Sequence, residues 1–127
     1  MPAETRYTRC ARVEAVTLLQ PTVNLIGGPE TDELDACVAE ADGQQVPAIV
    51  FDLSEVEFSN TVGLQVIVGA YLKLIRRGGA VFVFGLRPRV RHLFDVVRLD
   101  QLVRRFETRE EALAACVSSG PPPPAAR

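Results

Sequence analysis

The sequence predicts an α/β fold: a single domain with a mostly parallel sheet of four to five strands and helices packed around it. Residues 46–53 and 80–85 are near-continuous apolar runs, a pattern typical of central parallel strands that are covered on both faces. Segments with apolar residues at helical spacing separate these runs, so the expected order is β-β-α-β-α-β-α-β-α. With 127 residues, 47% of them hydrophobic, the chain is long enough to bury one core.

The outer strands are predicted from shorter runs. Residues 13–19 and 22–26 are apolar-rich and are separated by Gln20-Pro21, which indicates two strands with a turn between them. Near the other end of the chain, residues 102–106 are expected to add an edge strand. The sheet would then have its two apolar runs at the centre and weaker strands outside them.

The first and third helices have clear start and stop signals. Thr31 or Asp32 can cap the first helix, which ends at Asp42-Gly43. Its apolar residues recur at helical spacing, at Leu34, Cys37, Val38 and Ala41. The third helix is expected to begin at Pro88, because proline suits a first helical turn. Its predicted buried stripe is Val90, Leu93, Phe94 and Val97.

A final helix and a proline-rich tail complete the chain. Thr108 and Glu111 have the spacing of a capping box, and the helix they open should run through Cys116. Four consecutive prolines after Gly120 cannot continue a helix, so the tail is expected to be disordered or polyproline-like. The predicted division is an extension at residues 1–8, a domain at 9–117 and a tail at 118–127.

The second helix is predicted to open at Thr61 and to have two different faces. At about 100° per residue, one face should be the core face and holds Leu64, Ile67, Val68, Tyr71, Leu74 and Ile75. The other face holds Val62, Gln65, Val66, Gly69, Ala70, Lys73 and Arg76. Its first turns are small and apolar, which favours a docking surface for a partner. In the alternative interpretation, loops or the tail cover Val62 and Val66.

Composition argues against several classes of function. The 14 basic and 16 acidic residues give a net charge of −2, so direct nucleic-acid binding is not expected. No window approaches the roughly 18 apolar residues of a membrane span, and the first residues lack the apolar core of a signal peptide, so we expect a cytoplasmic protein without membrane contact. With His92 as its single histidine, the chain shows no catalytic constellation, and we predict that it is not an enzyme.

The cysteines do not indicate a metal site. Cys10, Cys37 and Cys116 are widely separated and form no Cys-x-x-Cys pair, so neither zinc nor another metal is expected. We interpret them as reduced, partly buried thiols that pack as small hydrophobic groups. A redox pair among them has no support in the sequence.

The junction between residues 46–53 and the second helix is the best candidate for a functional site. It places hydroxyl groups at Ser59 and Thr61, where a buried strand is followed by a helix start. A phosphate there would add roughly −1.5 to −2 charges, which the free N–H groups and positive dipole end of a helix tolerate. The surface would change its charge while the fold survives. From the local sequence alone, capping by one of these hydroxyls or by Asn60 is the competing interpretation.

The same junction resembles the STAS domain of bacterial anti-sigma factor antagonists. That family has Asp-Leu-Ser after a strand and then Asp-Ser-Ser-Gly-Leu or Asp-Ser-Thr-Gly-Leu at a helix start. Here the corresponding residues are Asp52-Leu53-Ser54 and Asn60-Thr61-Val62-Gly63-Leu64. The resemblance continues through Arg77-Gly78-Gly79, Arg87-Pro88-Arg89-Val90 and the segment 93–100, and spans about residues 9–117.

The resemblance implies a phosphorylation-controlled partner switch. Thr61 matches the residue that a partner kinase phosphorylates, and Ser59 is the second candidate acceptor. The implied partner is an anti-sigma factor of serine-threonine kinase fold, which would bind Asn60, Val62, Gln65, Val66, Gly69 and Lys73. ATP and Mg²⁺ would belong to that kinase, so the chain itself needs no cofactor, and a phosphatase would be a further partner.

Two departures and two alternatives accompany this interpretation. Asn60 stands where the family has Asp, and it keeps the size and capping ability of Asp without its charge. Val62 stands where the family has a second hydroxyl residue. One alternative is a STAS scaffold subunit of a stressosome-like complex. The other is a STAS domain that senses a small ligand near Gly27-Gly28 and Asn60.

Overall fold

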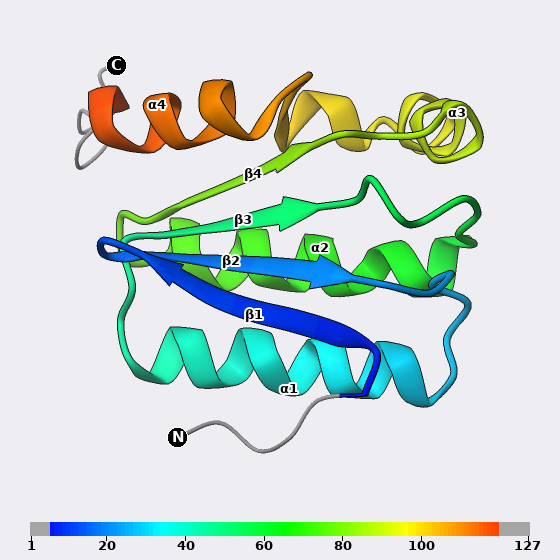
Figure 1. The fold of residues 1–127 in the computed structure, drawn as a ribbon, viewed down its shortest axis with the longest axis horizontal. Coiled ribbons are helices and arrows are strands. Elements are labelled where there is room, and N and C mark those ends of the chain that lie inside the picture. The colour runs from blue at the N-terminus through cyan, green and yellow to red at the C-terminus, as the bar shows by residue number, and fades with distance from the viewer. Residues whose placement is uncertain (1–5, 120–127) are drawn as a thin grey trace.

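The computed structural model describes residues 6–119, and its elements follow the predicted order with one 3₁₀ turn added. Within these residues five strands form one sheet, in the order β1-β2-β3-β4-β5 (Figure 1). The strands are β1 (Thr8–Val13), β2 (Val16–Pro21), β3 (Ala48–Asp52), β4 (Ala80–Phe84) and β5 (Arg104–Phe106). β1 is antiparallel to β2 and the other neighbours are parallel, which confirms the mostly parallel sheet.

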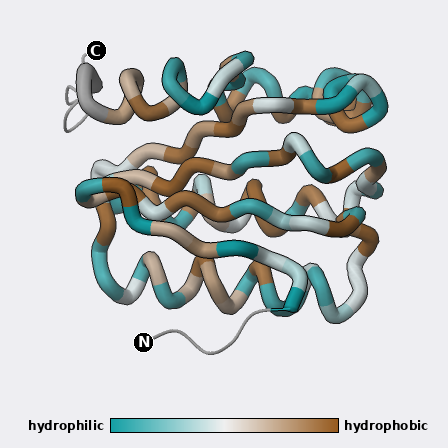
Figure 2. The backbone as a smooth tube through the Cα atoms, in the orientation of Figure 1, coloured by the Kyte–Doolittle hydropathy of each residue, from teal (hydrophilic) through white to brown (hydrophobic). Residues whose placement is uncertain are grey.

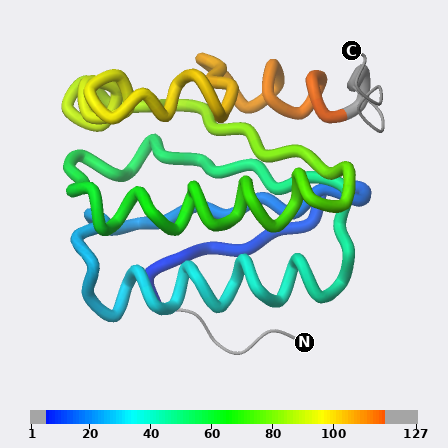
Figure 3. The backbone as a smooth tube through the Cα atoms, turned by 180° about the vertical axis from the view of Figure 1, so that it is seen from behind, coloured from blue at the N-terminus to red at the C-terminus, as the bar shows by residue number. Residues whose placement is uncertain are grey.

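Helices cover both faces of the sheet, as the two apolar runs predicted. Alternate residues of a strand point to opposite faces. Ile49 and Phe51 therefore pack with α1 (Pro29–Gly43) and α2 (Thr61–Ile75), whereas Ala48 and Val50 pack with α4 (Arg109–Ser119). The tube coloured by hydropathy shows brown segments along the central strands (Figure 2). Seen from behind, α1 and α2 lie next to each other across the sheet (Figure 3).

The predicted positions of the first two strands are wrong. The hairpin turn lies at Glu14-Ala15, where Glu14 has a φ of 56°, and Pro21 ends β2 instead of separating two strands. Residues 22–26 form a loop, whose one bridge joins Leu25 to Ser59. β1 is an edge strand with mostly exposed side chains, so it lacks the apolar pattern by which a strand is recognised.

The predicted cap of α1 is also wrong, and the capping box of α4 is confirmed in part. α1 begins at Pro29 after Gly28, and no side chain caps it. In α4, the Thr108 hydroxyl accepts a hydrogen bond from the Glu111 N–H at 3.1 Å, as expected. The Glu111 carboxylate, however, accepts from the N–H of Glu107 and not from that of Thr108.

The third helix, α3 (Pro88–Val96), begins where it was predicted but ends early. Val90 and Phe94 are buried, but Val97, which was expected in the same stripe, is 40% exposed. The chain leaves the helix at Arg98, whose φ is 64°, and forms the 3₁₀ turn η1 (Leu99–Gln101). β5 then starts two residues later than predicted. Residues 1–5 and 120–127, including the proline run, lie outside the described residues.

Candidate functional site

The N-terminus of α2 is capped by Asn60, which leaves the neighbouring hydroxyl free. Asn60 Oδ1 accepts a hydrogen bond from the Gly63 N–H at 2.8 Å, and its Nδ2 donates to the Ile26 carbonyl at 3.1 Å. Thr61 is exposed, and among the described residues its hydroxyl has no hydrogen-bond partner. The helix start is therefore stable without Thr61, and its hydroxyl is accessible for chemistry.

Ser59, the second predicted acceptor, lies in a different environment. It is 4% exposed, and its hydroxyl donates to the Asn60 carbonyl at 3.0 Å. Its backbone forms the bridge to Leu25. A kinase would have to open this part of the loop to reach it, so the structure favours Thr61 over Ser59 as the acceptor.

Close contact between α2 and the 22–28 loop explains the glycine after Val62. Gly63 is buried, and a Cβ atom added there would overlap the backbone of Leu25. Across the same contact, Gly27 has a φ of 92°, and a Cβ there would come within 2.8 Å of Val62 Cγ1. The first turn of α2 and the loop thus pack so closely that a Cβ atom at either glycine would clash, with backbone at Gly63 and with the Val62 side chain at Gly27.

The buried carboxylate of Glu30 holds this loop in place. Glu30 Oε2 accepts hydrogen bonds from the N–H groups of Ile26 (2.7 Å) and Gly28 (3.0 Å) and from the hydroxyl of Thr31 (3.0 Å). Burial raises the pKa of Glu30, but these hydrogen bonds outweigh it and leave the pKa below its usual value. Glu30 and Asn60 already form hydrogen bonds with backbone groups of Ile26 and Gly28. Few polar groups of the loop therefore remain for the small ligand of the alternative interpretation.

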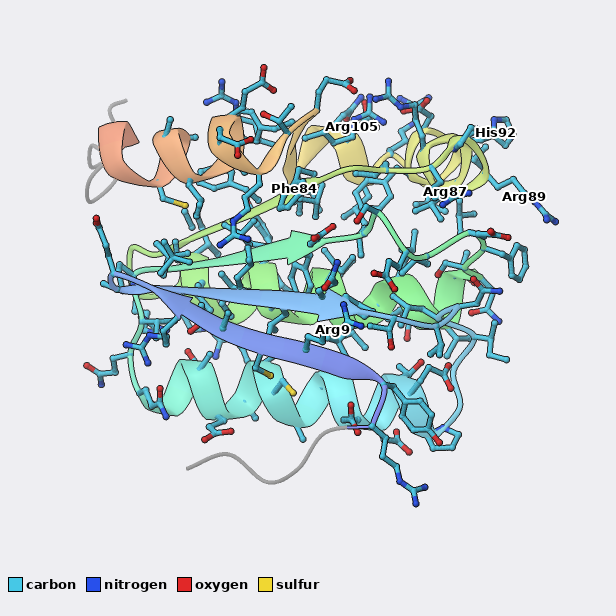
Figure 4. All side chains as sticks on the ribbon, viewed as in Figure 1. Arg9, Phe84, Arg87, Arg89, His92 and Arg105 are labelled. Atoms are coloured by element: carbon cyan, nitrogen blue, oxygen red, sulfur yellow. The ribbon has the colours of Figure 1, made fainter. Side chains whose placement is uncertain are left out.

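Two arginines that start α3 attach the loop between β3 and α2. Arg87 donates to the Ser54 carbonyl at 3.3 Å and forms an ion pair with Glu57 at 3.4 Å. The Arg89 guanidinium lies over the Phe58 ring, 5.0 Å from its centroid. Figure 4 shows Arg87 just before α3 and Arg89 on it, with the exposed His92 nearby. Sequence analysis missed this pair, since the contacts depend on the packing of two distant segments.

The predicted faces of α2 are partly wrong. Val66 is 6% exposed and Ala70 is fully buried, although both were placed on the exposed face. Both belong to the same cluster as Leu34 and Val38 of α1. Ile75, which was assigned to the core, is 47% exposed. The reason is that α2 is buried against α1 as well as against the sheet, and the position of α1 cannot be inferred from the periodicity of α2.

The other flank of α2 is open. Of the predicted partner-binding residues, Gln65 is exposed on this side. Val62 is exposed beside the 22–28 loop, Gly69 and Lys73 are half-buried, and Val66 is buried. A groove of about 220 Å³, which we call the α2–η1 groove, runs beside this flank. It is lined by Thr61, Leu64, Gln65, Val68, Val97, Leu99 and Leu102.

The walls of the groove are apolar and partly exposed. Of the lining residues, Val97 is 40% exposed and Leu102 is 48% exposed. Leu72, which lies on α2 outside the lining, is 50% exposed. The groove begins at Thr61, so the free hydroxyl borders an uncovered apolar surface. Such a surface is typical of a protein-binding site. Sequence analysis missed Leu102, because it counted this residue as part of a strand.

Other types of site find no support among residues 6–119. No group of three or more His, Cys, Asp or Glu side chains there is arranged to hold a metal ion. In the same part of the chain, no helix has the length and apolarity needed to cross a membrane.

Comparison with known proteins identifies the family. Residues 13–112 match the model of the STAS domain. The chain is 30% identical over 90 residues to the anti-sigma-B factor antagonist of Listeria monocytogenes, a match that covers 58% of this chain and 79% of that protein.

Solved structures share the fold. An anti-sigma factor antagonist from Mycobacterium paratuberculosis is 26% identical, with a TM-score of 0.75 over 87% of this chain and 92% of that one. The Bacillus protein SpoIIAA, which is 16% identical, has been solved in two forms. Its unphosphorylated form has a TM-score of 0.70 over 87% of this chain and 97% of that one. Its phosphorylated form has a TM-score of 0.68 over 84% and 96%.

Proposed function

This chain belongs to the STAS domain family, and we propose that it acts as an anti-sigma factor antagonist whose binding is controlled by phosphorylation of Thr61. The observation that carries the proposal is the free, exposed hydroxyl of Thr61 at the start of α2, next to the apolar α2–η1 groove. In the unphosphorylated state this surface binds an anti-sigma factor. The sigma factor held by that protein is then released.

A phosphate at Thr61 would act on the interface more than on the fold. The phosphate would lie at the N-terminus of a 15-residue helix, where the dipole and unpaired N–H groups stabilise an anion. An added charge of roughly −1.5 to −2 would, however, have to be buried against a partner across an apolar surface. Desolvation without a matching cation is costly, so the complex dissociates while the domain stays folded.

The proposed partner is an anti-sigma factor with a serine-threonine kinase fold. It would carry the ATP and Mg²⁺, and the Thr61 hydroxyl would attack the γ-phosphorus while ADP leaves and the hydroxyl proton passes to a base. A phosphatase would return the chain to its binding state. The proposed location of this exchange is the cytoplasm. The two solved forms of SpoIIAA, unphosphorylated and phosphorylated, support such a switch on this fold.

Phosphorylation is tested with a purified kinase that binds the chain. We expect incubation with ATP and Mg²⁺ to add one phosphate that mass spectrometry maps to Thr61. Thr61→Ala should abolish the product, whereas Thr61→Ser should keep it. A phosphate that maps elsewhere and persists in Thr61→Ala would refute the assignment of the acceptor.

Charge alone should reproduce part of the switch. Thr61→Glu should leave the stability unchanged or raise it by roughly 0.3–1 kcal/mol, because an acidic group suits a first helical turn. Its affinity for the anti-sigma factor should fall at least tenfold, about 1.4 kcal/mol. Gln65→Glu adds the same charge one turn later and shows how far the effect depends on position. Unchanged affinity in Thr61→Glu and in the phosphorylated protein would instead favour a scaffold subunit.

A further inference from the structure

Two of the three cysteines meet in the fold although they are far apart in the sequence. Cys10 lies on β1 and Cys37 on α1, 27 residues later, and their Sγ atoms are 3.5 Å apart and share a hydrogen bond. Cys10 is exposed and Cys37 is half-buried. The three cysteines are free thiols, and the expected partial burial is found for Cys37 and Cys116 but not for Cys10.

The sheet register explains why the two thiols meet. Cys10 is paired with Leu19 of β2, and paired residues on antiparallel strands point to the same face. Leu19 is fully buried in the cluster that includes Leu34 and Val38 of α1. Cys10 consequently points toward α1, beside Cys37. Both thiols line a cleft of about 160 Å³ between the sheet and α1, together with Arg12, Glu40 and Gln44.

The surroundings give the two thiols different chemistry. When Cys10 ionises, the Cys37 thiol donates a hydrogen bond to it, which lowers the pKa of Cys10 even though burial and the carboxylates of Glu40 and Glu33 oppose the shift. The same hydrogen bond, with burial, raises the pKa of Cys37. Cys10, the more exposed of the two thiols, thus suits the attacking role, and Cys37 stands next to it as a resolving thiol.

We propose that Cys10 and Cys37 form an oxidisable dithiol, which a hydroperoxide converts into an intramolecular disulfide. The Cys10 thiolate attacks a peroxide oxygen and breaks the O–O bond, and with hydrogen peroxide this gives a sulfenic acid and hydroxide. The hydroxide takes up the proton that Cys10 released on ionisation and becomes water. Cys37 then attacks the sulfenic sulfur, loses its proton and releases a second water. The pair loses two electrons and two protons, and the peroxide is reduced. The sulfurs must approach from 3.5 Å to about 2.05 Å.

The disulfide would connect an edge strand to a helix. It would close the segment that contains β2 and the 22–28 loop, and this loop contacts Asn60 and Val62 at the proposed phosphorylation site. In a reducing compartment such a bond is transient and forms in response to oxidation. This inference does not depend on the proposed function. The two cysteines lie on β1 and α1, whereas Thr61 begins α2, and the chemistry is different.

The test uses the full chain and hydrogen peroxide. After oxidation, titration should find one free thiol in place of three, and the intact mass should fall by about 2 Da. Dithiothreitol should restore both values. Mapping of peptides should find Cys10 linked to Cys37.

The matched control, Cys116→Ser, should still lose two thiols. Cys10→Ser and Cys37→Ser should form no intramolecular disulfide, and Cys37→Ser should accumulate an oxidised Cys10 that a sulfenic-acid probe labels.

Two further readouts separate the proposal from unspecific oxidation. The oxidised wild type should form no disulfide-linked dimer in non-reducing electrophoresis and should melt about 5 °C or more above the reduced form, whereas Cys10→Ser should show no such rise. Disulfide-linked dimers, a bond to Cys116, or equal thiol loss in Cys10→Ser and the wild type would each overturn the proposal.

Discussion

The two flanks of α2 are both rich in small apolar residues, but only one of them is buried. On the flank toward α1, Val66 and Ala70 are almost completely covered. On the flank toward η1, Gln65 is exposed and Leu72 is about half exposed, and the α2–η1 groove stays open. The comparison shows that an apolar helical face is a binding surface only where no second helix covers it. Thr61 borders the open flank, which is why we connect this flank with the partner.

The largest difference is expected from a charge on the covered flank. Val66→Asp should destabilise the domain by roughly 3 kcal/mol or more, because it buries an unpaired carboxylate between α2 and α1. Gln65→Glu, one residue away and exposed, should change the stability by less than about 0.5 kcal/mol. Urea unfolding followed by circular dichroism measures both. Similar stability of the two variants would mean that Val66 is not covered.

Two glycines of α2 should respond to alanine in opposite directions. Gly63→Ala should cost roughly 1–3 kcal/mol, since the new methyl group overlaps the backbone of Leu25. Gly69→Ala places its methyl group where no atom lies within 4 Å, so it should stabilise the helix by about 0.5–1 kcal/mol. Thermal unfolding distinguishes them. A stabilised Gly63→Ala would contradict the close contact between α2 and the loop.

Charges on the open flank should affect binding and not folding. Leu102→Asp and Leu72→Asp should each weaken the complex with the anti-sigma factor at least tenfold, about 1.4 kcal/mol, because an apolar contact becomes a buried charge. Their melting temperatures should stay close to that of the wild type. Isothermal titration calorimetry gives the affinities. Native affinity in both variants would place the interface outside the α2–η1 groove.

The smallest effect is expected from the titration of Glu30. The hydrogen bonds to its carboxylate hold the pKa below 4.5, the usual value of a glutamate, so the unfolded chain binds this proton first as the pH falls. The stabilisation is therefore complete above about pH 4.5 and decreases as the pH falls through the folded-state pKa. Chemical denaturation at a series of pH values should show this dependence in the wild type and a flatter one in Glu30→Gln. If the free energy of unfolding depended on pH in the same way in both proteins, the titration of Glu30 would not contribute to stability.

Local signals in the sequence were sufficient for much of the fold and for the position of the site. The continuous apolar runs predicted β3 and β4, because a strand buried on both faces has no room for polar side chains. Pro88 predicted the start of α3, and Thr61 was placed at the start of α2. The edge strand β1 was misplaced because exposed side chains leave no apolar pattern.

Residues that are neighbours along the chain were enough to predict the class of the fold, the junction that bears Thr61 and the family. The tertiary structure alone decided which flank of α2 is covered, that Asn60 and not Thr61 caps the helix, and that Cys10 meets Cys37. The physical reason is that a distant segment takes part in each case. The coverage of α2 and the sulfur contact are set by segments far away in the sequence, about which local periodicity carries no information. The Asn60–Gly63 bond is local, but the Ile26 carbonyl, 34 residues away, also binds the Asn60 side chain.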